Sequence, residues 1–158
     1  MYKTKNTLAD NTRKTSISLL QTALSSAIDL GLQCKQAHWN VKGPSFIALH
    51  ELFDQLNTEV TGYADQMAER IVSLGGQAYG TISTVKDTSS LDEYPKEAVK
   101  QSQHIEALSK ALAVFGGQVR IASDEAGETG DQNTSDLFTE ISRAIDKSLW
   151  FVEAHAAP

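Results

Sequence analysis

Five residues carry side chains of the kinds that bind transition metals: His38, His50, Asp54, Asp65 and Glu69. Four of them lie between positions 50 and 69, where a turn of about 100° per residue predicts one continuous polar stripe along a helix. Within that stripe, His50/Asp54 and Asp65/Glu69 are each spaced i, i+4, so each pair can converge on one ion. Imidazole combined with carboxylates suits Fe(II), although Zn or Mn would fit the same ligands.

The spacing of the two pairs predicts a site shared between two chains. Asp54 and Asp65 are separated by roughly 16 Å along a helix that rises 1.5 Å per residue, so one ion cannot be ligated by both. An antiparallel second copy of this helix would place the partner's Asp65 and the partner's Glu69 beside His50 and Asp54. A two-fold interface of this kind would contain two equivalent sites. His38, at the end of the preceding helix, could supply another nitrogen.

The stripe also has a simpler interpretation, because exposed helices often carry His, Asp and Glu on a solvated face. Periodicity alone does not separate the two interpretations. His104 and His155 have no ligand-type neighbours, and we expect both at the surface. Cys34 is expected to be a small buried side chain, since no neighbouring residue would favour its thiolate.

Four segments with apolar residues at helical spacing must position these side chains. We expect helices over residues 11–41 and 44–74, a third that begins at Pro95, and a fourth capped by Asn133 or Thr134. Gly43-Pro44 and Gly75-Gly76 mark the ends of the first two helices. Residues 77–94 are expected to form a long connection with a short helix at 91–94, and residues 125–133 a loop. Gly116-Gly117 predicts close packing or a kink.

Two short connections and one long central one are typical of the ferritin-like bundle. The predicted fold is therefore all-α, a ferritin-like four-helix bundle with a long crossover between the second and third helices. Residues 1–10 would form a short basic tail and residues 11–158 the bundle domain.

The charge of the chain is unevenly distributed. Residues 1–14 hold Lys3, Lys5, Arg13 and Lys14 against Asp10, a local charge of +3, which leaves −9 for the rest of a chain whose net charge is −6. An acidic body suits cations and repels phosphate. With a single cysteine, no apolar run of about 20 residues and no signal segment, we expect a cytoplasmic protein without a membrane partner.

Three segments resemble the signature of the Dps mini-ferritins. These are AHWNVKGP at 37–44, LHELFD at 49–54 and DQMAER at 65–70. The segment DKSLWFVE at 146–153 is similar to that family's C-terminal helix. The resemblance covers the chain from about residue 11 onward and places all five ligand-type residues in register.

The resemblance implies a ferroxidase that assembles as a hollow dodecamer built from two-fold dimers. Iron would be bound at the dimer interface by His38, His50 and Asp54 of one subunit with the partner's Asp65 and the partner's Glu69. Members of the family oxidise Fe(II), often with hydrogen peroxide in preference to dioxygen, and store Fe(III) in the cage. This chemistry protects DNA from oxidative damage. The residues themselves do not distinguish peroxide from dioxygen, or Fe from Zn or Mn in the purified protein.

Two further roles are predicted, one from position and one from the resemblance. Trp39, beside a predicted ligand, would either intercept an oxidising equivalent or pack at the dimer interface. The family has an acidic three-fold pore near the connection between the third and fourth helices, where Asp131 and Asp136 are our candidates; a solvated loop is the alternative. The acidic residues around this connection are Asp124, Glu125, Glu128, Asp131 and Asp136.

Direct DNA binding is the main alternative function. In some members of the family it depends on a long lysine-rich tail, and this sequence departs from that pattern, with only Lys3 and Lys5 before the first helix. We therefore expect DNA contact to be weak and sensitive to salt. A nucleoid-associated protein that acts mainly on DNA would lose binding on deletion of residues 1–14. A scaffold with an inactive metal stripe would take up no iron.

Overall fold

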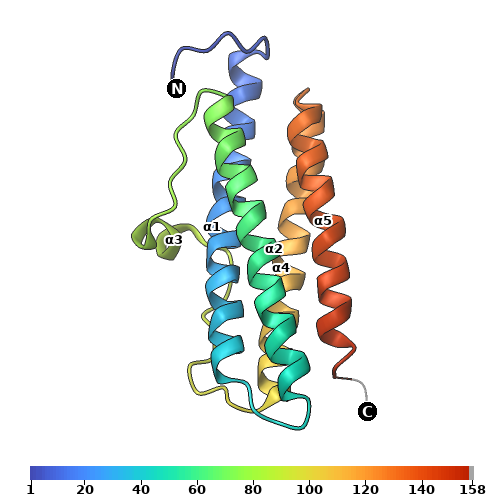
Figure 1. Ribbon diagram of the computed structural model, residues 1–158. Helices are drawn as coiled ribbons and strands as arrows, with labels where there is room; N and C mark the ends of the chain where they lie inside the picture. Colours follow the sequence, from blue (N-terminus) through green and yellow to red (C-terminus); the bar gives the residue numbers. More distant parts are fainter. Residues whose placement is uncertain (157–158) are drawn as a thin grey trace.

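The computed structural model describes residues 1–156 and contains five helices (Figure 1): α1 (Asp10–Asn40), α2 (Phe46–Ser73), α3 (Ile82–Thr88), α4 (Gln101–Glu128) and α5 (Gln132–Glu153). The four long helices form a bundle, and the short α3 lies within the connection between α2 and α4. The predicted all-α bundle with a long central crossover is confirmed. The last two positions of the predicted domain lie outside the described residues.

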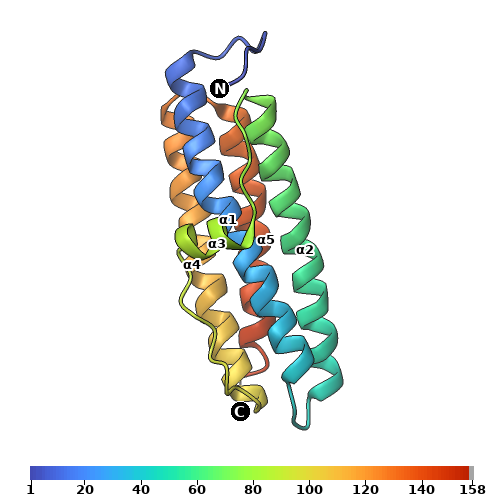
Figure 2. The ribbon, with the colours of Figure 1, turned by 90° about the vertical axis from the view of Figure 1, so that its left-hand side faces the viewer.

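The four long helices form two pairs, in which α1 packs along α2 and α4 along α5. The two helices of each pair run in opposite directions (Figure 1). The crossover runs the length of the bundle, from the end of α2 to the start of α4 at the opposite end (Figures 1 and 2). Polar side chains of α1 hold it in place. Gln33 Nε2 donates to the backbone oxygen of Asp92 at 3.1 Å, and Asp29 Oδ2 accepts from the Ser89 hydroxyl at 2.6 Å.

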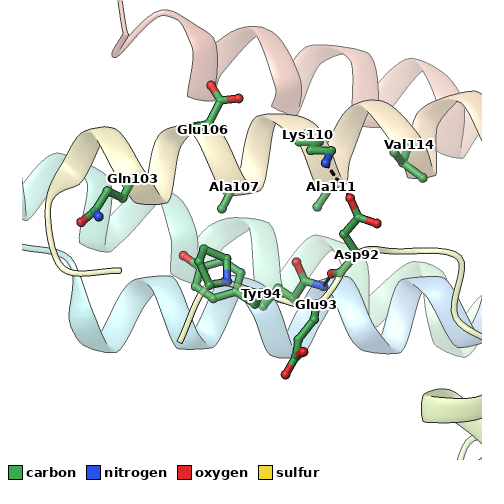
Figure 3. A pocket seen from close by; sticks show the side chains of 11 residues that line it. Asp92, Glu93, Tyr94, Gln103, Glu106, Ala107, Lys110, Ala111 and Val114 are labelled. Carbon is green, nitrogen blue, oxygen red and sulfur yellow. Dashed lines mark hydrogen bonds and ion pairs between the residues drawn. The ribbon is translucent and has the colours of Figure 1, made fainter. Parts of the chain in front are cut away.

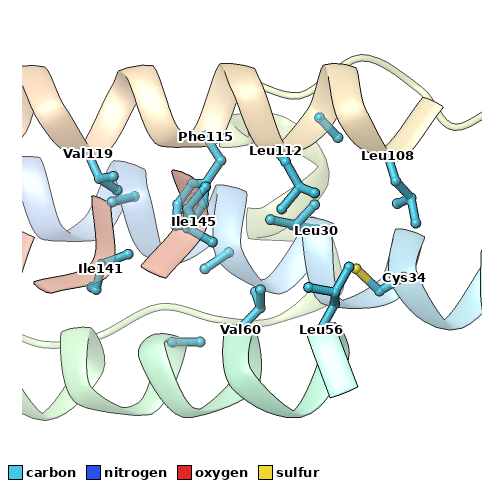
Figure 4. Close-up of a cluster of buried hydrophobic side chains, with 14 of the residues drawn as sticks. Leu30, Cys34, Leu56, Val60, Leu108, Leu112, Phe115, Val119, Ile141 and Ile145 are labelled. Atoms are coloured by element: carbon cyan, nitrogen blue, oxygen red, sulfur yellow. The ribbon is translucent and has the colours of Figure 1, made fainter. Parts of the chain in front are cut away.

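Apolar side chains from all four long helices meet along the bundle axis (Figure 4). Cys34 is fully buried among them, as predicted. Burial raises the pKa of the Cys34 thiol to about 12, so the side chain is a neutral thiol at physiological pH. No helix among residues 1–156 is long and apolar enough to cross a membrane.

The start of the third long helix was predicted too early. It begins at Gln101 rather than Pro95, because a β-bridge holds the preceding residues extended. Lys42 donates its N–H to Val99 and accepts from the N–H of Gln101. The helix predicted at 91–94 is also wrong, since α3 forms at Ile82–Thr88, where Val85 is buried.

The connection between α4 and α5 is shorter than predicted. Residues 125–128 remain helical, and only residues 129–131 separate the two helices. Asp131 caps α5 in place of Asn133 or Thr134, because its carboxylate accepts from the N–H of Thr134 at 3.1 Å. The chain turns at Gly130, whose φ of +90° favours glycine.

The two glycines inside α4 have different surroundings. A Cβ at Gly116 would lie 3.2 Å from Cγ2 of Ile145 on α5, whereas a Cβ at Gly117 would meet no atom within 4 Å. The predicted close packing is therefore confirmed at Gly116. The helix continues through both positions from Gln101 to Glu128.

Candidate metal centre

His38, near the end of α1, and His50, in the first turns of α2, face each other across the turn that joins these helices. Their rings stack with centroids 3.7 Å apart and an interplanar angle of 20°. His38 Nδ1 lies 2.7 Å from the backbone oxygen of His50, and His50 Nδ1 lies 2.9 Å from that of His38. Since a carbonyl oxygen only accepts, each Nδ1 carries the hydrogen. Nε2 of each ring takes part in neither of these hydrogen bonds, and in a neutral imidazole with hydrogen on Nδ1 it is the nitrogen that can bind a metal.

Asp54 lies beside the two imidazoles, one helical turn beyond His50. Its Oδ1 accepts from Lys35 Nζ at 2.6 Å. The hydrogen bond from Lys35 holds the pKa of Asp54 below its usual value, and the nearby His38 and His50 act in the same direction. The carboxylate is therefore ionised, with an ammonium group at the position where a bound cation would balance its charge.

Asp65 and Glu69 are exposed on α2, further along the helix from Asp54. Neither has a hydrogen-bond or ion-pair partner within residues 1–156, and these residues nowhere gather three or more His, Cys, Asp or Glu side chains about one point. A single chain thus stacks His38 on His50 and places Asp54 within reach of their charge, without converging the three on one point, and it leaves Asp65 and Glu69 further along α2. The predicted ligand set divides into two halves, one at each end of α2.

Exposed large apolar side chains flank the two histidines in the sequence. Trp39 is 67% exposed, Ile47 61% and Phe46 45%. Phe46 also lies against His50, with ring centroids 5.2 Å apart. Clusters of exposed large apolar residues mark contact surfaces more often than single ones do. Within its own described chain Trp39 is contacted by Lys35, whose Nζ lies 5.9 Å from the ring centroid, and is otherwise largely exposed, so both of its predicted roles stay open.

The acidic group near the turn between α4 and α5 requires one correction. Asp131 was a candidate pore residue, but its side chain is 1% exposed and pairs with Arg70 Nη2 at 2.8 Å. Burial acts to raise the pKa of Asp131, but hydrogen bonds from Thr134 and the charge of Arg70 outweigh it and hold the pKa low. Asp131 is thus a structural cap rather than a pore lining. Asp136 is exposed on α5, and its pore role stays a prediction.

Sequence reasoning missed two features near this end of α1. Lys35 was not considered, although its position three residues before His38 places both on one helix face. His104 was expected at the surface, but it is completely buried and hydrogen-bonded to Tyr94. Its partner lies in the crossover, so nothing in the local sequence indicated the contact. His155 is partly exposed and hydrogen-bonds through Nδ1 to the backbone oxygen of Phe151.

Comparisons with known proteins agree with the fold. Residues 17–157 match the model of the ferritin-like domain family. The DNA protection during starvation protein of Agrobacterium fabrum is 47% identical over 154 residues, which cover 98% of this chain and 95% of that protein. Dps of Mycobacterium smegmatis superimposes with a TM-score of 0.92 at 34% identity, covering 97% of this chain and 93% of that one. Dps of Microbacterium arborescens, solved in a high-iron form, has a TM-score of 0.89 at 32% identity, with 95% and 97% covered.

Proposed function

The chain belongs to the Dps proteins of the ferritin-like family, and we propose on that premise that it is a ferroxidase that oxidises Fe(II) and stores the Fe(III) product in a hollow homo-oligomeric cage. Iron is both substrate and cargo. The preferred oxidant would be hydrogen peroxide, so that the reaction removes two reagents that together damage DNA. The names of its Agrobacterium and Mycobacterium relatives, which refer to DNA protection and to Dps, support this assignment.

The observation that carries the proposal is the mutual orientation of His38 and His50. Each ring is fixed by a hydrogen bond from Nδ1 to the other's backbone, which frees both Nε2 atoms. Metal-binding histidines commonly donate their second ring nitrogen to a carbonyl, as both rings do here. Solvated surface histidines can hydrogen-bond to water and do not require this pairing. The neighbouring Asp54 adds an ionised oxygen ligand.

The ligand chemistry accounts for the direction of the reaction. Carboxylate oxygens are hard anionic ligands and favour the higher charge of Fe(III) over Fe(II). His38, His50 and Asp54 of one subunit, with the partner's Asp65 and the partner's Glu69, would supply few protein ligands per iron. Coordination positions would then remain for peroxide or water. The net charge of −6 favours the approach of Fe(II).

Stopped-flow absorbance of ferric product tests the proposal. Fe(II) is mixed with the assembled protein, with peroxide or dioxygen as oxidant, for wild type, Asp65→Ala and Glu97→Ala. Glu97 is an exposed acid of the crossover and serves as the matched control. We expect Asp65→Ala to slow oxidation by at least roughly tenfold, since even groups that only support a ligand contribute that much. Equally slow traces in all three proteins would overturn the ferroxidase assignment.

Direct DNA binding has less support in the structure. Arg13, one of the four basic residues near the start, is 8% exposed and donates to the backbone oxygen of Leu74 and to Asp10. The segment before α1 folds back onto the end of α2, where the N–H of Tyr2 donates to Gly75. Lys3, Lys5 and Lys14 remain exposed. This arrangement favours protection of DNA by removal of iron and peroxide over direct condensation.

A further inference from the structure

The turn that joins α1 to α2 is held by the side chain of Gln101, the first residue of α4. Residues 41–45 form this turn between the two helices. Oε1 of Gln101 accepts from the N–H of Ser45, the residue that directly precedes α2, at 3.1 Å. A side chain of α4 thus holds the position at which α2 starts.

The amide of Gln101 lies directly against the backbone of the turn. A Cβ at Gly43 would stand 2.7 Å from Oε1 of Gln101 and 3.2 Å from its Cδ. The φ of Gly43 is +148°, so glycine suits this position both for its conformation and for the close approach of the amide. The absence of a side chain at Gly43 therefore leaves the space through which Gln101 reaches Ser45.

Backbone hydrogen bonds hold the same turn at a second point. The N–H of Lys42 donates to the backbone oxygen of Val99 at 3.0 Å, and the backbone oxygen of Lys42 accepts from the N–H of Gln101 at 3.1 Å. These two bonds form the bridge between Lys42 and Lys100. Because the turn is fixed both at Lys42 and at Ser45, it cannot pivot about either point alone.

The start of α4, to which the turn is attached, is itself well held. Oε1 of Gln103 accepts from the N–H groups of Val99 and Lys100, at 3.1 and 3.0 Å, and so caps the helix. Further along α4, Lys110 Nζ pairs with Asp92 of the crossover at 2.6 Å, across a groove of about 470 Å³ that Gln103 also lines (Figure 3). The first turn of α4 therefore has little freedom to follow a movement of the turn between α1 and α2.

A short series of contacts leads from Gln101 to two predicted iron ligands. The backbone oxygen of Ser45 accepts from the N–H of Leu49 at 3.0 Å, and His50 follows Leu49 in the chain. The backbone oxygen of His50 lies 2.7 Å from Nδ1 of His38, and the two rings stack with centroids 3.7 Å apart. A shift of the start of α2 relative to α1 would lengthen this hydrogen bond and turn the rings.

We propose that Gln101 is a positioning residue of the metal centre, which sets the orientation of His38 and His50 by holding the turn between α1 and α2. Gln101 does not bind the metal in this scheme. The inference rests on the proposed function for the identity of the metal, whereas the orientation of the two rings is a property of the metal-free chain. Both Nε2 atoms are in place before a metal arrives, so binding does not have to order the turn.

Three substitutions of Gln101 separate its hydrogen bond from the bulk of its side chain. Gln101→Met keeps the length of the side chain and removes the acceptor. Gln101→Asn keeps the amide and withdraws its oxygen from Ser45 by one methylene, and it decides the question if Gln101→Met does not fold. Gln101→Glu keeps an acceptor oxygen at the original reach. Ser102→Ala changes the exposed neighbour on α4 and is the matched control.

Titration of the assembled, metal-free proteins with Co(II), followed by its visible absorbance, measures binding at the centre. His50→Ala identifies the part of the signal that belongs to it. We expect Gln101→Met and Gln101→Asn to bind Co(II) at least roughly tenfold more weakly and with an altered spectrum, since groups that support a metal ligand contribute that much. Gln101→Glu and Ser102→Ala should bind as wild type does. A merely structural role for Gln101 would lower the temperature of thermal unfolding without changing the Co(II) spectrum.

Crystal structures of the metal-free variants give a readout that depends on no metal. We expect Gln101→Met to lose at least one of the two hydrogen bonds between the rings of His38 and His50 and the opposite backbone, and Gln101→Glu to keep both. Rings that keep their stacking and both hydrogen bonds in Gln101→Met and in Gln101→Asn would overturn the inference.

The two measurements separate failure of this inference from failure of the proposed function. Co(II) binding that is equal in wild type, Gln101→Met and Gln101→Asn, but lost in His50→Ala, overturns the role of Gln101 and leaves the metal centre intact. Co(II) binding that His50→Ala does not weaken overturns the metal centre, and with it the proposed ferroxidase. The crystal structures then still decide whether Gln101 orients the two rings.

Discussion

At the scale of single residues, the candidate centre depends on side chains that fix one another's chemistry. His38 and His50 each donate from Nδ1 to the other's backbone, so the turn between α1 and α2 determines which nitrogen of each ring can bind a metal. The residue types could be identified from sequence, because their i, i+4 spacing indicated a ligand stripe. The reciprocal hydrogen bonds could not, since they depend on how closely the two helix ends approach.

Lys35 provides a prediction at this scale. Its ammonium group is 2.6 Å from Asp54, so an incoming cation must compete with it for the carboxylate. We expect Lys35→Gln to bind Zn(II), used as a redox-inert probe, a few-fold more tightly, the modest effect expected when an exposed ion pair is removed. Asp54 stays ionised near neutral pH, because without Lys35 its pKa only returns toward the usual range.

Isothermal titration calorimetry of the assembled protein measures this affinity. Lys86→Gln, which removes an exposed lysine of α3, is the matched control and should leave the affinity unchanged. Weaker Zn(II) binding by Lys35→Gln than by wild type would show that Lys35 supports the site instead of competing with the metal.

At the scale of helices, the sequence predicted the helix ends that are determined by residues nearby in the chain. Gly75-Gly76 marked the end of α2, which closes at Ser73. The start of α4 was missed because it depends on the bridge between Lys42 and Lys100, residues far apart in the chain. The cap of α5 was missed at Asp131, whose carboxylate accepts locally from Thr134 and is held in place by a long-range ion pair with Arg70 from α2. Long-range contacts of this kind leave no periodic signal in the sequence.

The adjacent glycines of α4 give a prediction at this scale. Alanine is favoured over glycine inside a helix by about 1 kcal/mol. At Gly117 a methyl group meets no atom within 4 Å, so Gly117→Ala should raise the free energy of unfolding by up to about that amount. At Gly116 the methyl group would press on Ile145 at 3.2 Å and offset the gain. Thermal unfolding followed by circular dichroism should place Gly116→Ala below Gly117→Ala; the reverse order would contradict the packing described here.

At the scale of the whole molecule, the bundle was predictable from sequence because four amphipathic segments and one long connection leave few topologies. The assembly was only partly predictable. The separation of His50/Asp54 from Asp65/Glu69 along one helix predicts that two chains share each site. The cage itself is implied by the family and has no signal in the periodicity of a single chain.

The distribution of charge leads to a prediction about DNA. Because Arg13 is buried and the first residues fold back onto α2, only a few exposed lysines near the start can contact phosphates. In gel-shift assays we expect weak binding at low salt that disappears at physiological salt, since each phosphate contact contributes roughly −0.9 to the slope of log K against log salt. A Lys3→Gln/Lys5→Gln variant should lose the shift and keep its rate of iron oxidation. A shift that survives both the salt and the substitutions would make DNA binding the main function.

The central claim is that each iron site combines residues of two subunits, and mixing two inactive variants tests it most directly. His50→Ala and Asp65→Ala each spoil every site when alone. If they are unfolded together in equal amounts and refolded, half of the dimers are mixed. Each mixed dimer has one site with both defects and one with neither. We therefore predict recovery of about one quarter of the wild-type stopped-flow rate of Fe(II) oxidation, as two-fold symmetry requires. A mixture no more active than the separately refolded variants would contradict a site shared between subunits.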